Sequence, residues 1–181
     1  MSFYDDWSRG KDNKEYMLAY LIKAEPSREV LRYGTEAEVK NACDLLRSIP
    51  MEVFIDSMKE LPHDRLPETD EIPQCGTLEK AICEVPQALA FAPDGLKCAE
   101  LGLRLGAASG GDAPRKSGEG NGKLADAMDI AVRMKLPADS RTGIKYGYKI
   151  SSLGRYLLRF PDIIDKMDII ARLLAREYVA Q

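Results

Sequence analysis

The chain has 181 residues, of which 45% are hydrophobic and 30% are charged, as in a soluble globular protein of one domain or two small ones. Its longest apolar stretches, residues 16–22 and 88–91, are far shorter than the roughly 18 residues that span a membrane. Residues 1–14 lack the apolar core of a secretory signal, so a cytoplasmic protein is expected. The net charge of −3 is unevenly spread, because residues 101–160 carry 11 basic and 5 acidic side chains, a balance of +6. This basic segment indicates an anionic partner, although short segments also differ by several charges by chance.

The first third of the chain predicts a small folded unit and a linker. Residues 1–60 are expected to form a β-β-α-β unit. Its strands are expected at residues 15–24, 28–33 and 51–55. Its helix is expected to begin at Thr35 and Glu38, which match a capping box and precede apolar residues at helical spacing. Residues 61–76 predict a linker or a long surface loop, because they hold prolines, which lack a backbone donor, among acidic side chains that repel one another.

The middle of the chain predicts two helices followed by a loop. Residues 77–91 have helical periodicity, and Pro86 is expected to kink or split this helix. Asp94 is the expected N-cap of a second helix over residues 95–105. Residues 106–122 contain several glycines among polar side chains, and this composition predicts a flexible loop.

A helix, a basic β-hairpin and a second helix are predicted next. Residues 121–136 have apolar side chains at helical spacing along one face. Residues 140–150 predict the hairpin, because apolar side chains alternate with lysine and glycine in its second strand, as in a half-buried strand. Residues 151–160 predict the second helix, with Ser151 or Ser152 as its N-cap.

A last helix is predicted over residues 161–181, and its apolar residues step by four and three positions, as in a coiled coil. The residues of this seam are Ile163, Met167, Ile170 and Leu174. Together with a second apolar row through Ile164 and Leu173, they exceed what one contact strip requires. A homodimer built on this helix is therefore expected, although such helices more often belong to the core of their own chain.

The sequence carries no signature of catalysis or of metal binding. The single histidine, His63, lies in the acidic linker, and no two of the four cysteines form a Cys-x-x-Cys pair. We therefore expect reduced thiols, no metal, no cofactor and no enzymatic activity. The stretch before Leu124 resembles a phosphate loop, but Ser117 and Leu124 stand where a Walker A motif has glycine and serine or threonine.

Basic side chains gather on the predicted hairpin, on the helix before it and on the preceding loop. They are Arg115, Lys116, Lys123, Arg133, Arg141, Lys145 and Lys149. On the hairpin, Arg141, Lys145 and Lys149 are expected to bind phosphates, while Lys123 and Arg133 would approach the major groove of a duplex. Asp126 and Asp129 are expected to face outward on the same helix and to repel phosphates. A solvated surface, on which lysines protect a strand edge from aggregation, explains the same residues without a ligand.

Residues 123–136, followed by residues 148–157, resemble winged-helix domains of bacterial and archaeal regulators. In that superfamily the hairpin leads into a helix start of the Thr/Ser-x-Leu-Gly-Arg type, which Ser151, Leu153, Gly154 and Arg155 match. The resemblance covers residues 77–160 and implies a winged-helix domain that binds duplex DNA, as a transcriptional regulator or an accessory of a mobile element. The chain departs from the pattern in its long glycine-rich loop and in its two outward carboxylates.

The expected fold is therefore α+β, with a β-β-α-β unit in residues 1–60, a linker in residues 61–76, a mainly helical winged-helix domain in residues 77–160 and a C-terminal helix in residues 161–181. Winged helices also serve as protein-interaction modules. A second hypothesis is thus an inhibitor or assembly factor, which docks on a protein complex through the acidic N-terminal region and the winged helix.

Overall fold

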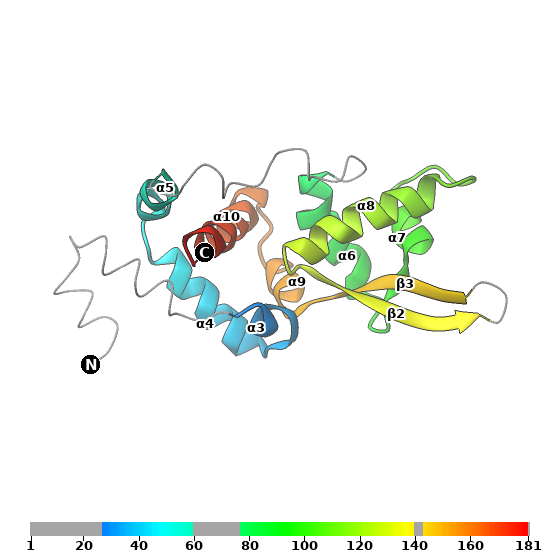
Figure 1. The fold of residues 1–181 in the computed structure, drawn as a ribbon, viewed down its shortest axis with the longest axis horizontal. Helices are drawn as coiled ribbons and strands as arrows, with labels where there is room; N and C mark the ends of the chain where they lie inside the picture. Colours follow the sequence, from blue (N-terminus) through cyan, green and yellow to red (C-terminus); the bar gives the residue numbers. More distant parts are fainter. Residues whose placement is uncertain (1–26, 60–76, 140–142, 181) are drawn as a thin grey trace.

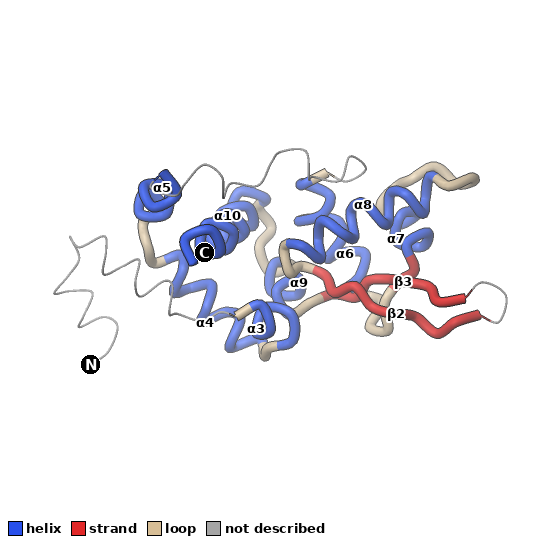
Figure 2. The backbone as a smooth tube through the Cα atoms, viewed as in Figure 1, coloured by secondary structure: helices blue, strands red, loops and turns tan. Residues whose placement is uncertain are grey.

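The computed structural model describes residues 27–59, 77–139 and 143–180, and it shows helices together with one small antiparallel sheet (Figures 1 and 2). The predicted α+β class is confirmed at this level. In Figure 1, helices α4, α5 and α10 gather at one end of the molecule, and α7, α8 and the β2–β3 hairpin gather at the other. Among the described residues, no helix combines the length and the apolar character that crossing a bilayer requires.

The N-terminal part of the described chain is helical: α3 spans Arg28–Tyr33, α4 spans Glu36–Arg47 and α5 spans Met51–Lys59. The capping box at the start of α4 is confirmed, since the Thr35 hydroxyl accepts from the Glu38 N–H and the Glu38 carboxylate accepts from the Thr35 N–H.

Two strands predicted in this part of the chain are wrong, because α3 and α5 occupy their places. Segments this short, which mix apolar and charged side chains, suit a strand and a helix equally well, and their surroundings decide. The Ser27 hydroxyl caps α3 by accepting from the Val30 N–H, and α5 packs against α10. The strand predicted at residues 15–24 lies outside the described residues.

The helix predicted over residues 77–91 is confirmed, and it widens where the proline was expected to disturb it. A π-helical turn, η3, spans Lys80–Glu84, and α6 continues over Val85–Ala90 with Pro86 in its first turn. Proline has no N–H to donate to the preceding turn, and a wider turn is one way in which a helix accommodates that loss.

The next predicted helix begins three residues later than expected. Strand β1 spans Leu96–Lys97, and α7 spans Cys98–Arg104. Gly95, with φ of +89°, turns the chain into β1 in a conformation that suits glycine.

The helix predicted over residues 121–136 is wrong in position. Helix α8 spans Ala113–Ala127, so it begins inside the predicted flexible loop, and strand β2 spans Ala131–Asp139. Between them Asp129 takes a left-handed φ of +59°, which ends the helix and starts the strand.

Close packing of α7 against α8 explains why a glycine-rich stretch is helical. A Cβ atom on Gly118 would lie 1.7 Å from the carbonyl oxygen of Cys98, and one on Gly102 would lie 1.7 Å from that of Pro114. Only glycine permits such an approach of two backbones. A Cβ on Gly122 would lie 2.4 Å from the ring of Tyr148, so the same helix also rests directly on the sheet.

The second strand of the predicted hairpin is confirmed as β3, Gly143–Ile150, whereas the first strand is β2, most of which was expected to be helix. β3 pairs with β2 on one side and with β1 on the other, all antiparallel. The hairpin leads into α9, Ser152–Leu157, with Ser151 as the N-cap as predicted. The Ser151 hydroxyl accepts from the Gly154 N–H at 2.9 Å and donates toward the Ile130 carbonyl at 2.7 Å, which fixes α9 to the start of β2.

The predicted last helix is confirmed as α10, Ile163–Ala180, but part of its expected dimer seam lies in the core of its own chain. α10 packs against α4 and α5, and Ile170 is 3% exposed within the hydrophobic core. Leu174 is partly buried against the same core, whereas Met167 is 41% exposed. Homodimer formation stays a prediction, and Ile170 is not available for it.

Candidate nucleic-acid interface

A groove of about 330 Å³ lies beside the N-terminal half of α8, the start of α7 and the β2–β3 hairpin. We call it the basic groove; its polar and aromatic lining consists of Lys97, Cys98, Arg115, Glu119, Arg133, Lys145, Tyr146 and Tyr148. Its cations come from β1, α8, β2 and β3. Among the described residues that line it, Glu119 is the only acidic one.

The exposed side of α8 adds cations next to the basic groove. Arg115, Lys116 and Lys123 are exposed on this helix. Glu119 accepts from Arg115 at 3.1 Å and pairs with Lys123 at 2.9 Å. The hydrogen bond from Lys123 lowers the pKa of the Glu119 carboxyl, with smaller contributions from the charges of Lys123, Arg115 and Arg133. The carboxylate is therefore ionised at neutral pH, and three cations surround it.

On the hairpin, an arginine and a tyrosine are stacked at the edge of the groove. The guanidinium of Arg133 lies 4.4 Å from the centre of the Tyr146 ring, in a cation–π arrangement. Arg133, which was predicted to lie on a helix, belongs to β2, where Lys135 is the next residue on the same face and is also exposed. In the strand register, Lys135 pairs with Tyr146 and Arg133 with Tyr148.

The two hairpin lysines of the prediction lie on the opposite face of the sheet from these tyrosines, because successive side chains of a strand alternate. Lys145 pairs in register with Leu136, and Lys149 with Val132. Both lysines are half-buried. Lys145 still borders the basic groove, whereas Lys149 is outside its lining.

The structure thus brings together some of the basic residues that were predicted to bind a nucleic acid. Arg115, Arg133 and Lys145 line one groove, and Lys116 and Lys123 lie on the exposed side of α8. Arg141 lies outside the described residues. Lys97 and Lys135 were missed. The alternation of Arg133 with Lys135 would have indicated Lys135 if this segment had been recognised as a strand.

Asp126 and Asp129 do not face outward as predicted, and this is a correction to the expected surface. The side chain of Asp129 is 6% exposed and accepts from Arg32 at 2.6 Å and from Arg28 at 3.2 Å. Asp126 forms an ion pair with Arg32 at 3.1 Å and accepts from the backbone N–H of Arg133 at 3.2 Å. The left-handed turn after α8 places Asp129 against α3, whereas Asp126 pairs with Arg32 of α3 and also contacts the backbone of the groove residue Arg133.

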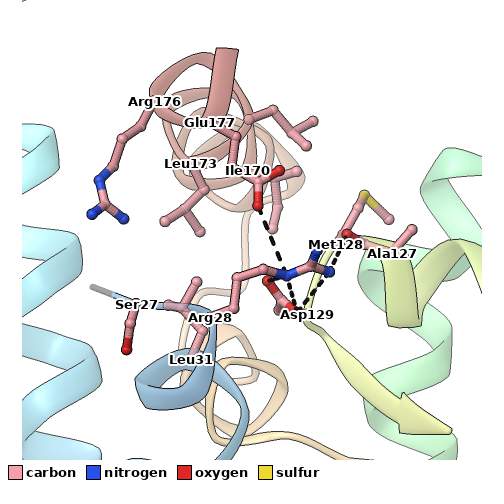
Figure 3. Close-up of a pocket in the computed structure, with 11 residues that line it drawn as sticks. Ser27, Arg28, Leu31, Ala127, Met128, Asp129, Ile170, Leu173, Arg176 and Glu177 are labelled. Atoms are coloured by element: carbon pink, nitrogen blue, oxygen red, sulfur yellow. Dashed lines mark hydrogen bonds and ion pairs between the residues drawn. The ribbon is translucent and has the colours of Figure 1, made fainter. Parts of the chain in front are cut away.

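Figure 3 shows this contact, in which the guanidinium of Arg28 points at Asp129 beneath α10. A second cavity, of about 220 Å³, lies beside it between α3, α10 and the end of α8. Leu31, Met128 and Leu173 give it an apolar lining, and Arg28 also pairs with Glu177 of α10 at 3.8 Å. The contact therefore joins the N-terminal helices and α10 to the turn between α8 and β2.

The floor of the interface is Tyr148, which is 1% exposed beneath Gly122 of α8. Burial raises the pKa of Tyr148 to about 12, and burial likewise raises the pKa of Tyr156 to about 12. The folded protein therefore keeps these phenol protons at pH values where the unfolded chain, with an ordinary tyrosine pKa of about 10, loses them.

We expect the free energy of unfolding to be unaffected by these groups below about pH 10 and to fall as the pH rises from about 10 toward about 12, because the unfolded state binds fewer protons there. Urea unfolding at a series of pH values measures this slope. The variant Tyr148→Phe should show a shallower fall, since one of the two phenols is removed. A fall of equal steepness in both proteins would contradict a buried phenol at this position.

The thiol of Cys98 lines the basic groove. Burial raises the pKa of the Cys98 thiol, and the nearby Glu119 carboxylate adds to the effect. Within the described ranges, no group of histidine, cysteine, aspartate and glutamate side chains is placed to hold a metal ion. The geometry of the groove suits an anionic ligand bound by charge and hydrogen bonds.

Comparison of the chain with protein-family models, with curated proteins and with solved structures finds no match.

Proposed function

We propose that the protein binds duplex DNA through the basic groove and the exposed side of α8, with residues 77–160 arranged as a winged helix. The order of elements supports this proposal: α7 and α8 form a closely packed helix pair, and an antiparallel hairpin follows α8 directly. In such a domain α8 is the helix that enters the major groove and the hairpin is the wing.

The observation that carries the proposal is the convergence of cations from four elements on one groove. Lys97, Arg115, Arg133 and Lys145 all line it. Two carboxylates that were expected to oppose a phosphate, Asp126 and Asp129, are paired with Arg32 of α3, which leaves Glu119 as the acidic side chain among the described residues that line the groove. Phosphate contacts supply most of the affinity of proteins for DNA, so this charge distribution favours a nucleic acid over an uncharged ligand.

The dimensions of α8 are also suitable. Its 15 residues correspond to a length of about 22 Å, and a major groove of about 12 Å width admits one helix. Arg115 and Lys116 lie in the first turns of α8, at the end of the molecule where the hairpin also projects (Figure 1). A duplex on this end would contact helix and hairpin together.

The test is the affinity for a fluorescent duplex of about 20 base pairs, measured by anisotropy from about 50 to about 200 mM salt. Four phosphate contacts predict a slope of log K against log salt of about −3.6, which is a loss of roughly 100-fold over this range. The double variant Arg115→Gln/Arg133→Gln should bind more weakly and reduce the slope by about 2, because two contacts are lost.

A charge-matched control is Lys40→Gln/Arg159→Gln, which removes two cations that pair with Asp44 and Glu36 outside the basic groove. It should bind nearly as the parent does. Equal losses in the two double variants would mean that net charge alone governs binding. No binding at about 50 mM salt would refute the proposal.

A further inference from the structure

The exposed side of α8 carries a carboxylate at the centre of a row of cations. Arg115, Glu119 and Lys123 follow one another at intervals of four residues, and their side chains are 51%, 34% and 47% exposed. At 1.5 Å per residue the row is about 12 Å long, which is the rise of roughly three to four base pairs. Neighbouring side chains of the row are about 6 Å apart, close to the rise of two base pairs, so the three side chains are spaced to meet every second base pair along one groove.

A carboxylate in this position opposes every phosphate that approaches it. The ion pairs of 3.1 Å to Arg115 and 2.9 Å to Lys123 compensate its charge in the free protein, but each cation that turns to a phosphate or a base leaves the carboxylate less compensated. Glu119 is thus unfavourable in a complex with DNA unless a hydrogen-bond donor of the ligand meets it. In the major groove, the donors are the N4 amino group of cytosine and the N6 amino group of adenine.

The two amino groups differ in their surroundings. Adenine presents the acceptor N7 beside its amino group, and a carboxylate has no hydrogen with which to satisfy that acceptor, whereas asparagine and glutamine do. Guanine and thymine present acceptors, which repel a carboxylate and suit the donors of Arg115 and Lys123. Cytosine is therefore the base whose major-groove edge fits Glu119. The guanine paired with it presents acceptors, which suit the two cations that flank Glu119.

We propose that Glu119 is a specificity-determining residue that accepts a hydrogen bond from the N4 amino group of cytosine, so that the protein prefers duplex sites with a C·G pair at this position. The inference rests on the proposed function, because it requires α8 to lie in the major groove. It adds sequence preference to a surface that phosphate contacts alone would make indifferent to sequence.

The experiment is a selection of bound duplexes from a library randomised over about ten base pairs, carried out with the full chain and with Glu119→Gln. The parent should enrich cytosine at one position and, in anisotropy with matched duplexes, favour C·G there by about tenfold over the other pairs. Glu119→Gln should lose the preference for C·G and favour adenine at that position. At every other position it should keep the base preferences of the parent. Lys40→Gln serves as the control and should leave the motif unchanged.

The outcomes separate this inference from the proposed function. Binding to duplexes without any enriched motif, or the same motif in the parent and in Glu119→Gln, would overturn the role of Glu119 and leave DNA binding intact. A uniform gain in affinity of Glu119→Gln for every sequence would also overturn it, because the carboxylate would then only neutralise its neighbours. Absence of duplex binding by the parent at low salt would refute the proposed function itself, and the inference with it.

Discussion

Replacement of Gly118 by alanine should destabilise the fold by roughly 3 kcal/mol, although alanine ordinarily favours a helix over glycine by about 1 kcal/mol. The added Cβ would lie 1.7 Å from the carbonyl oxygen of Cys98 and 2.9 Å from the backbone nitrogen of Gly102. Both are backbone atoms of α7, so the clash is relieved only when α7 and α8 move apart. Chemical unfolding followed by circular dichroism measures the loss.

The matched control for this change is Lys116→Ala on the same helix. Lys116 is exposed, and its replacement should alter the free energy of unfolding by no more than about 0.5 kcal/mol. If Gly118→Ala were as stable as the parent protein, the close approach of the two helices would be wrong, and with it the position of α8 relative to the hairpin.

Replacement of Asp129 by alanine is expected to be equally severe, at roughly 3 kcal/mol or more. The Asp129 side chain is 6% exposed and binds Arg32, which is 20% exposed, so removal of the carboxylate leaves a largely buried guanidinium without its main partner. The backbone φ of +59° at this position adds to the effect, because alanine tolerates it less well than aspartate or asparagine.

Two further variants separate these contributions. Asp129→Asn keeps a side chain that tolerates the left-handed conformation and removes the charge, so its loss should be smaller than that of alanine. Arg28→Ala should lower the free energy of unfolding by a still smaller amount, about 1 kcal/mol or below. The Arg28 side chain is 55% exposed, and solvent screens its ion pair with Asp129. Equal stabilities of Asp129→Ala and the parent in urea unfolding would show that the contact between α3 and the α8–β2 turn does not hold the fold together.

Elements with a strong local signal were predicted correctly. The capping box at Thr35 and Glu38, the alternation along β3 and the Ser151 cap each depend on residues close together in the chain. The pair of helices around Pro86 belongs to the same group. In these cases the physical cause of the element lies within a few residues of it.

Elements that depend on distant packing were not predicted. Gly118 and Gly102 look like loop residues until the helices are placed together, because only the close contact of two backbones makes glycine favourable in α8. The segments of α3 and α5 are short, and the burial of their apolar side chains against the rest of the chain decides that they are helices.

The same distinction between local and long-range causes holds for the residues of the candidate site. The sequence identified Arg115, Arg133 and Lys145 from their type and clustering, without their arrangement around one groove. The inward position of Asp129 could not be predicted from the sequence, because its partner Arg32 lies 97 positions away in the chain. This long-range contact buries the Asp129 carboxylate, which is one of the two that weighed against a nucleic acid.

We propose that DNA contacts the end of the molecule formed by α8 and the hairpin. The most direct test is a titration of isotopically labelled protein with a short duplex, followed through the backbone amide signals. We expect shifts in the first turns of α8, in β2 and β3 and at Lys97, with the signals of α4, α5 and α10 unchanged. Shifts confined to α4, α5 and α10, or no shifts at low salt, would contradict it.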